Sequence, residues 1–143
     1  MRNSIALISQ NFIGEREIKS SVTKVAKDLK LSIDEVTDIH MDVFIPEHDL
    51  LGIWLCSKKQ FEEQLSTGLI QNALACVAVI YYSNKDLLLI PFLKKILSLY
   101  PEVMVFNDEI AGSDPLIFTK SQIDAFVTND VYDNLFTPPD TRA

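Results

Sequence analysis

The segment Cys76–Tyr82 (CVAVIYY) constrains the fold more than any other part of the sequence, because apolar side chains occupy both of its sides. β-branched and aromatic residues favour extended backbone, and a strand that is apolar on both sides belongs in the middle of a sheet. The longer apolar stretch that contains it, 73–82, has about half of the roughly 20 residues that a helix needs to cross a bilayer. The segment therefore predicts a central strand of a folded domain and no membrane span.

Two earlier segments show the different hydrophobic periods of a helix and a strand. Between Glu15 and Leu31 the apolar residues are spaced by three and four positions, with lysines on the opposite side, which predicts a helix. The segment Val36–Ile45 alternates apolar and polar residues, which predicts a strand with one side in the core. A short polar turn after Pro46 leads into the apolar run Leu50–Cys56, so these two strands are expected to form an antiparallel hairpin.

The remaining segments continue the alternation of strands and helices. Pro91 fits only the first turn of a helix, which is expected over 89–100, although Leu87–Ile90 also fits a short strand. Thr119 and Gln122 have the spacing of a capping box at the start of a helix over 120–129. The other expected elements are a strand at 4–9, a helix at 58–65, and strands at 102–106 and 116–118.

Together these segments predict a single compact α+β domain over residues 1–143, with the order β-α-β-β-α-β-α-β-β-α. The sheet is expected to be mixed or antiparallel and flanked by helices, and the first six elements match a split β-α-β arrangement. Residues 136–143, which include Pro138-Pro139, are expected to form a frayed tail. Exposed edges of a sheet can pair with a second molecule, so a homodimer is compatible with this prediction.

Composition excludes several classes of function. The four glycines are isolated from one another, so the chain has neither a P-loop nor a dinucleotide-binding glycine motif. The net charge of −7 opposes binding to the phosphates of nucleic acids. The N-terminal apolar stretch is too short for a secretory signal, and Cys56 and Cys76 lie among apolar residues, as expected for buried, reduced thiols. We therefore expect a cytoplasmic protein that binds neither nucleic acid nor a membrane.

The negative charge is concentrated in two stretches. Residues 31–50 contain six acidic residues and no Lys or Arg, and residues 101–143 contain eight acidic residues against two basic ones. Such a stretch is either solvated surface or a surface that attracts a basic partner. The candidate partner-binding residues lie on the predicted strand 36–45, in the turn after it and in the loop after strand 102–106: Asp38, His40, Asp42, Glu47, Asp49, Asp108, Glu109 and Asp114.

The pattern Asp38-x-His40-x-Asp42 is the strongest candidate for chemistry, because alternate residues share one side of a strand. A histidine between two carboxylates can hold a metal ion or act as a base, so a metal-dependent enzyme is one alternative, and a regulatory α/β module that binds a small ligand is another. A solvated or partner-binding strand needs the same polar alternation, however. No nucleophile motif accompanies the pattern, and Trp54 in its apolar run is expected in the core. We therefore assign no catalytic residue, metal or cofactor and expect no enzymatic activity.

The segment Ile90–Ile110 (IPFLKKILSLYPEVMVFNDEI), followed by LIFTKSQIDAF at 116–126, combines three features. A helix ends in Tyr-Pro, a strand ends in Asn-Asp-Glu, and a short strand leads into a Thr-capped helix. This layout resembles the small immunity proteins of bacterial polymorphic-toxin and contact-dependent growth inhibition systems. The resemblance implies an acidic, cytoplasmic, single-domain inhibitor that binds and neutralises a cognate toxin domain, such as a nuclease with a basic surface. It carries over no active-site residue, because such inhibitors have none.

Overall fold

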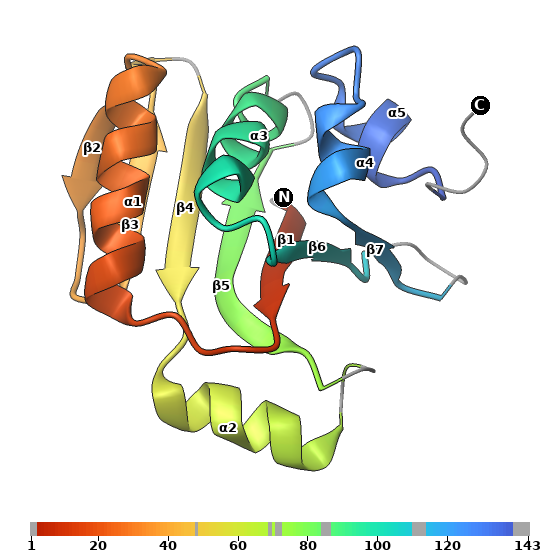
Figure 1. Cartoon of the computed structure of the whole chain (residues 1–143). Helices are drawn as coiled ribbons and strands as arrows, with labels where there is room; N and C mark the ends of the chain where they lie inside the picture. Colours follow the sequence, from red (N-terminus) through yellow and green to blue (C-terminus); the bar gives the residue numbers. More distant parts are fainter. Residues whose placement is uncertain are drawn as a thin grey trace.

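Seven strands form one antiparallel sheet in the computed structural model, which describes residues 3–47, 49–68, 70, 73–83, 87–109 and 114–138 (Figure 1). The strands lie in the order β2-β3-β4-β5-β1-β6-β7, so β5 takes the central place that the apolar segment 76–82 predicts. Their bounds are β1 Asn3–Ser9, β2 Ser32–Glu35, β3 His40–Phe44, β4 Leu50–Leu55, β5 Ala75–Tyr82, β6 Met104–Asn107 and β7 Leu116–Phe118.

Three helices cover one face of this sheet. Helices α1 (Glu15–Asp28), α3 (Leu89–Leu99) and α4 (Lys120–Asp124) lie across it, with α5 (Val131–Leu135) beside α4, whereas α2 (Lys58–Thr67) crosses the end where β4 stops (Figure 1). None of the described helices is both long and apolar enough to cross a membrane.

The main core lies between the sheet and these three helices, and a second, smaller buried cluster is formed by Ile8, Ile70 and Leu74. The buried side of α1 is the predicted apolar stripe, and each fully buried side chain of this kind stabilises the fold by about 1.5–3 kcal/mol. The strand residues that face the helices are apolar and almost completely buried: Ile5, Leu7, Met41, Val43, Leu51, Ile53, Ile80, Val105 and Phe118.

All ten predicted elements are present in the predicted order, and the fold class is α+β. Two further elements, β2 and α5, add to these ten, and each is too short to show a period. The helix predicted over 120–129 stops at Asp124. There the carbonyl of Phe126 accepts a hydrogen bond from Lys94 Nζ at 2.6 Å, and Val127, which the helical pattern places inside, is exposed.

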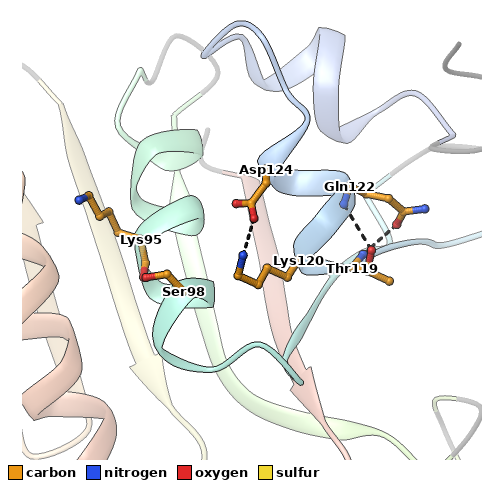
Figure 2. A network of polar contacts seen from close by, with 6 residues as sticks. All are labelled: Lys95, Ser98, Thr119, Lys120, Gln122 and Asp124. Atoms are coloured by element: carbon orange, nitrogen blue, oxygen red, sulfur yellow. Dashed lines mark hydrogen bonds and ion pairs between the residues drawn. The ribbon is translucent and has the colours of Figure 1, made fainter.

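The predicted helix starts are confirmed. Pro91 is the third residue of α3, so Leu89 and Ile90 are helical and do not form a strand. At α4 the Gln122 side chain accepts from the Thr119 N–H at 2.8 Å, and Thr119 Oγ1 accepts from the Gln122 N–H at 3.3 Å (Figure 2). This reciprocal pair satisfies two N–H groups that a helix start otherwise leaves without partners.

The split β-α-β arrangement expected of the first six elements is wrong. It requires β1 to lie next to β4, but β5 lies between them and pairs with β1 along the whole of Asn3–Ser9. Helix α2 therefore connects two neighbouring antiparallel strands, β4 and β5. The doubly apolar β5 gains the greatest burial in the central position, which local sequence patterns do not specify.

The chain stays packed further toward its end than the predicted tail over 136–143 implies. Phe136 packs against the core, and its ring lies 4.8 Å from that of Tyr132. The last part of the predicted tail, 139–143, lies outside the described residues.

The two edges of the sheet are short. Strand β2 has four residues and β7 has three, and β2 carries the acidic residues Asp34 and Glu35. Short and charged edges oppose hydrogen bonding to the strands of a second molecule.

Candidate binding surface

The face of the sheet opposite to α1, α3 and α4 carries polar and aromatic side chains near its centre. The register places His40 opposite Trp54 on the neighbouring strands β3 and β4, and Trp54 opposite Val79 of β5. Because side chains alternate along a strand, these residues project from the same side of the sheet. We call this side the open face; it carries Ser4, Ala6, Asp34, His40, Asp42, Phe44, Leu50, Trp54, Val79, Tyr81, Phe106 and Ile117. Its β1–β6–β7 part is covered, because Ala6, Phe106 and Ile117 pack against the buried residues Ile8, Ile70 and Leu74.

His40 is held by contacts to two of these residues. Its Nε2 donates a hydrogen bond to Asp42 Oδ1 at 2.8 Å, two residues along the same strand. Its ring stacks on Trp54, with 4.1 Å between the ring centroids and 15° between the ring planes. The side chains of His40 and Asp42 are 16% and 20% exposed. The three side chains therefore form one ordered cluster on the open face.

Trp54 and Tyr81 are the residues that sequence reasoning misses. The prediction that Trp54 lies in the core is wrong, since 39% of this residue and 38% of Tyr81 are exposed. Their own segments give no signal, because Leu50–Cys56 and Cys76–Tyr82 are apolar on both sides. The neighbouring strand does indicate the position of Trp54. Because β3 alternates polar and apolar residues and pairs His40 with Trp54, Trp54 must lie on the same side of the sheet as His40.

Negative charge on the open face lacks compensation by lysine or arginine. Asp34 of β2 lies directly opposite Asp42 of β3, and like charges in such a pair repel. Every Lys and Arg among the described residues lies on a helix or, at Lys30, shortly after one. The described strands therefore carry acidic residues and one histidine but no permanent positive charge.

Asp38 does not share the strand with His40 and Asp42. Strand β3 begins at His40, and Asp38 is exposed in the turn from β2, where the N–H groups of Val36 and Thr37 donate to the His40 carbonyl at 2.9 and 3.1 Å. The strand predicted over 36–45 starts later because the chain must reverse there to pair with β2.

Of the predicted Asp-His-Asp group, only His40 and Asp42 lie together, which leaves two side chains that could act as metal ligands. Within the described parts of the chain, no group of three or more His, Cys, Asp or Glu side chains is close enough to hold a metal ion. The hydrogen bond to Asp42 fixes the orientation of the His40 ring on this face of the sheet.

The other candidate residues gather at one end of the sheet. Antiparallel pairing brings together the ends of β3, β5 and β6, the start of β1 and the start of β7. Four strand intervals separate β3 from β6, a distance of about 19 Å. We call the acidic residues at this end the acidic rim; it consists of Glu47, Asp49, Asp108, Glu109 and Asp114.

Glu109 has a structural role within the acidic rim. Its Oε1 accepts hydrogen bonds from the N–H and the hydroxyl of Ser4, at 3.2 and 3.0 Å. Its own N–H donates to Asn107 Oδ1 at 3.0 Å. Glu109 therefore joins the end of β6 to the start of β1, whereas the neighbouring Asp108 is exposed and presents its charge to solvent.

Compared with known proteins, the chain matches no family model, no curated protein and no solved structure. The chemistry of the open face and of the acidic rim is therefore the basis for assigning a function.

Proposed function

We propose that this protein is an immunity-type inhibitor that binds a cognate toxin domain through the open face and the acidic rim. One observation carries the proposal: the described strands present acidic and aromatic side chains without any lysine or arginine, while the described basic residues lie on helices or, at Lys30, shortly after one. A surface of this kind complements a groove lined with lysines and arginines, and such complementarity speeds association and selects the partner.

A toxin domain that acts on a nucleic acid is the partner that fits this chemistry best. Such a domain must expose basic side chains to bind phosphates. An inhibitor that covers those side chains excludes the substrate and needs no chemistry of its own. The sequence resemblance of residues 90–126 to immunity proteins supports the same interpretation.

The two regions have different expected roles in binding. Trp54 and Tyr81 lie near the centre of the open face and are partly exposed, and these residue types dominate the binding energy of many interfaces. The acidic rim lies at the end of the sheet, where exposed charges act mainly on the rate of encounter. We infer that the aromatic residues anchor the toxin domain and that the rim attracts it.

Growth rescue in bacteria tests this function. The genes beside this one are first searched for a large secreted protein with a variable C-terminal domain. That domain is then co-expressed with this protein in cells that the domain alone kills. The wild-type protein is expected to restore growth. The double variant Trp54→Ala/Asp108→Lys is expected to lose rescue.

The matched control Tyr132→Ala/Glu102→Lys likewise replaces one exposed aromatic residue with alanine and one exposed carboxylate with lysine, outside the open face and the acidic rim. It is expected to rescue growth as the wild type does, with equal amounts of soluble protein in all strains. Failure of the wild-type protein to rescue, or full rescue by the first double variant, would contradict the proposal.

A further inference from the structure

Two cysteines from neighbouring strands meet at the end of the sheet next to α2. Cys56 follows the last residue of β4, and Cys76 is the second residue of β5. The Cys56 N–H donates to the Val77 carbonyl at 3.1 Å, so the two strands are still paired at this point. The two Sγ atoms lie 3.2 Å apart, and both cysteines are free thiols.

A β-bulge directs Cys76 toward Cys56. The register of β1 and β5 pairs Leu7 with Ala78 and Ile8 with Cys76, so Val77 has no partner on β1. Val77 lines a small apolar cavity on the helix side of the sheet. In a regular strand, Val77 would lie on the same side as Val79, which is the open face. The extra residue shifts this alternation, so that Cys76 lies on the open face in place of Val77.

An open groove gives access to the thiol pair from solvent. It runs between α2 and the sheet, has a volume of about 430 Å³ and is lined by both cysteines together with α2 residues such as Gln60 and Gln64. Gln64 Oε1 accepts from the Cys76 N–H at 2.8 Å, which fixes α2 next to the sulfur atoms. Cys76 is only 5% exposed, whereas Cys56 is half-buried, so a reagent in the groove reaches Cys56 first.

The two thiols also differ in acidity. In the thiol pair the Cys56 S–H donates to Cys76 Sγ at 3.2 Å, and the Cys76 S–H donates to the Ala78 carbonyl at 3.2 Å. The contact with Cys76 lowers the pKa of Cys56, because the Cys76 S–H can turn to the Cys56 thiolate once it forms. The same contact, and then burial, raises the pKa of Cys76. The more accessible sulfur is therefore also the one that more readily becomes a thiolate, which is the nucleophilic form.

We propose that Cys56 and Cys76 are a redox-modification site that forms an intramolecular disulfide by exchange with a low-molecular-weight disulfide, such as glutathione disulfide. The inference is independent of the toxin partner. Formation of a disulfide requires the two Sγ atoms to move closer by about 1 Å, from 3.2 Å to bonding distance.

The exchange balances in two steps. The Cys56 thiolate attacks one sulfur of glutathione disulfide, the S–S bond of the oxidant breaks, and glutathione thiolate leaves and takes up the proton that Cys56 lost. Cys76, after its proton has passed to water, attacks the Cys56 sulfur and displaces the second glutathione thiolate, which becomes protonated. Two protein thiols are oxidised to one disulfide, and the oxidant is reduced to two glutathione molecules.

The first step prepares the second. Once Cys56 is in the mixed disulfide, it no longer carries the negative charge that helps to raise the pKa of Cys76. The resulting bond joins the end of β4 to the start of β5 and closes the chain segment that contains α2. Oxidation therefore locks the pairing of β4 and β5 at the base of this segment.

Intact mass spectrometry of the full-length protein tests the proposal. The reduced protein is incubated with excess glutathione disulfide, quenched with acid at a series of times and weighed without reduction. The wild-type protein is expected to end as a species that has lost the mass of two hydrogen atoms, with the Cys56–glutathione adduct appearing only transiently. A wild-type protein that keeps both thiols, or ends with glutathione attached, would overturn the proposal.

Two single variants assign the roles of the cysteines. Cys76→Ser is expected to stop at one stable glutathione adduct on Cys56, because the resolving thiol is absent. Cys56→Ser is expected to react at least tenfold more slowly than Cys76→Ser, since Cys76 is buried. Equal rates for the two variants would contradict the assignment of Cys56 as the attacking residue, and the wild-type result stands even if a variant fails to fold.

Discussion

His40 of β3 stacks on Trp54 of β4 with their ring centroids 4.1 Å apart, and the same imidazole donates a hydrogen bond to Asp42. The two rings restrict each other's movement on the open face. Side chains that are already ordered lose less conformational entropy when a partner binds. The stack is therefore a preorganised centre for recognition on the open face.

Replacing Trp54 with alanine is expected to weaken binding to the toxin domain by about thirtyfold, a loss of about 2 kcal/mol. The reason is that Trp54 offers a large aromatic surface that is 39% exposed in the free protein. The dissociation constant measured by calorimetry checks this expectation. Tyr132→Ala is the matched control, because it removes an exposed aromatic ring from α5, outside the open face. Equal affinity of the two variants would show that Trp54 does not anchor the partner.

Reversing the charge of Asp108 is expected to slow association more than it speeds dissociation. Asp108 is exposed on the acidic rim, and exposed charges near an interface mainly steer the encounter. Stopped-flow or biolayer measurements at low salt should give an association rate constant about tenfold lower for Asp108→Lys. The difference should shrink as salt is added. The control Glu102→Lys lies just before the start of β6, whereas Asp108 follows its end. It should leave both rate constants unchanged. A similar decrease for both variants would show that the net charge of the protein alone, and not the acidic rim, sets the association rate.

Replacing Asp34 with asparagine is expected to raise the free energy of unfolding by about 0.5 kcal/mol. The exchange removes the repulsion between Asp34 and Asp42, which lie opposite each other on β2 and β3. Urea unfolding at low salt measures the change. Glu35→Gln on the same strand is the control for removing one negative charge. The account of this pair fails if the two variants gain the same stability.

Replacing Asn107 with alanine is expected to lower the free energy of unfolding by about 2–3 kcal/mol. Asn107 is completely buried; its Nδ2 donates to the Leu135 carbonyl at 2.8 Å, and its Oδ1 accepts from the Glu109 N–H at 3.0 Å. The variant leaves both backbone groups without this partner and detaches α5 from β6. Urea unfolding measures the loss, with the exposed Asn129→Ala as control. A loss no larger than that of the control would contradict the role of Asn107.

The parts of the fold that could be predicted from the sequence depend on local rules. The apolar stripe of α1 and the alternation of β3 follow from the periods of a helix and a strand. The start of α4 follows from the capping box of Thr119 and Gln122, and that of α3 from the fixed backbone angle of Pro91.

The parts that could not be predicted depend on which strands become neighbours. The place of β5 between β4 and β1 leaves no local signature, and neither does the bulge at Val77 that directs Cys76 toward Cys56. The candidate site shows the same division. The alternation of β3 identified His40 and Asp42, whereas Trp54 became visible only through the register of β4. Asp38 was misplaced because a strand period does not show where the chain reverses.

The most direct test of the central claim is an NMR titration of the labelled protein with the toxin domain. If the open face is the binding surface, the largest changes in chemical shift will occur at His40, Trp54 and Tyr81, with smaller changes along the acidic rim and none on the outer sides of α1 and α3. Changes confined to α1 and α3, with the signals of His40 and Trp54 unmoved, would contradict the claim.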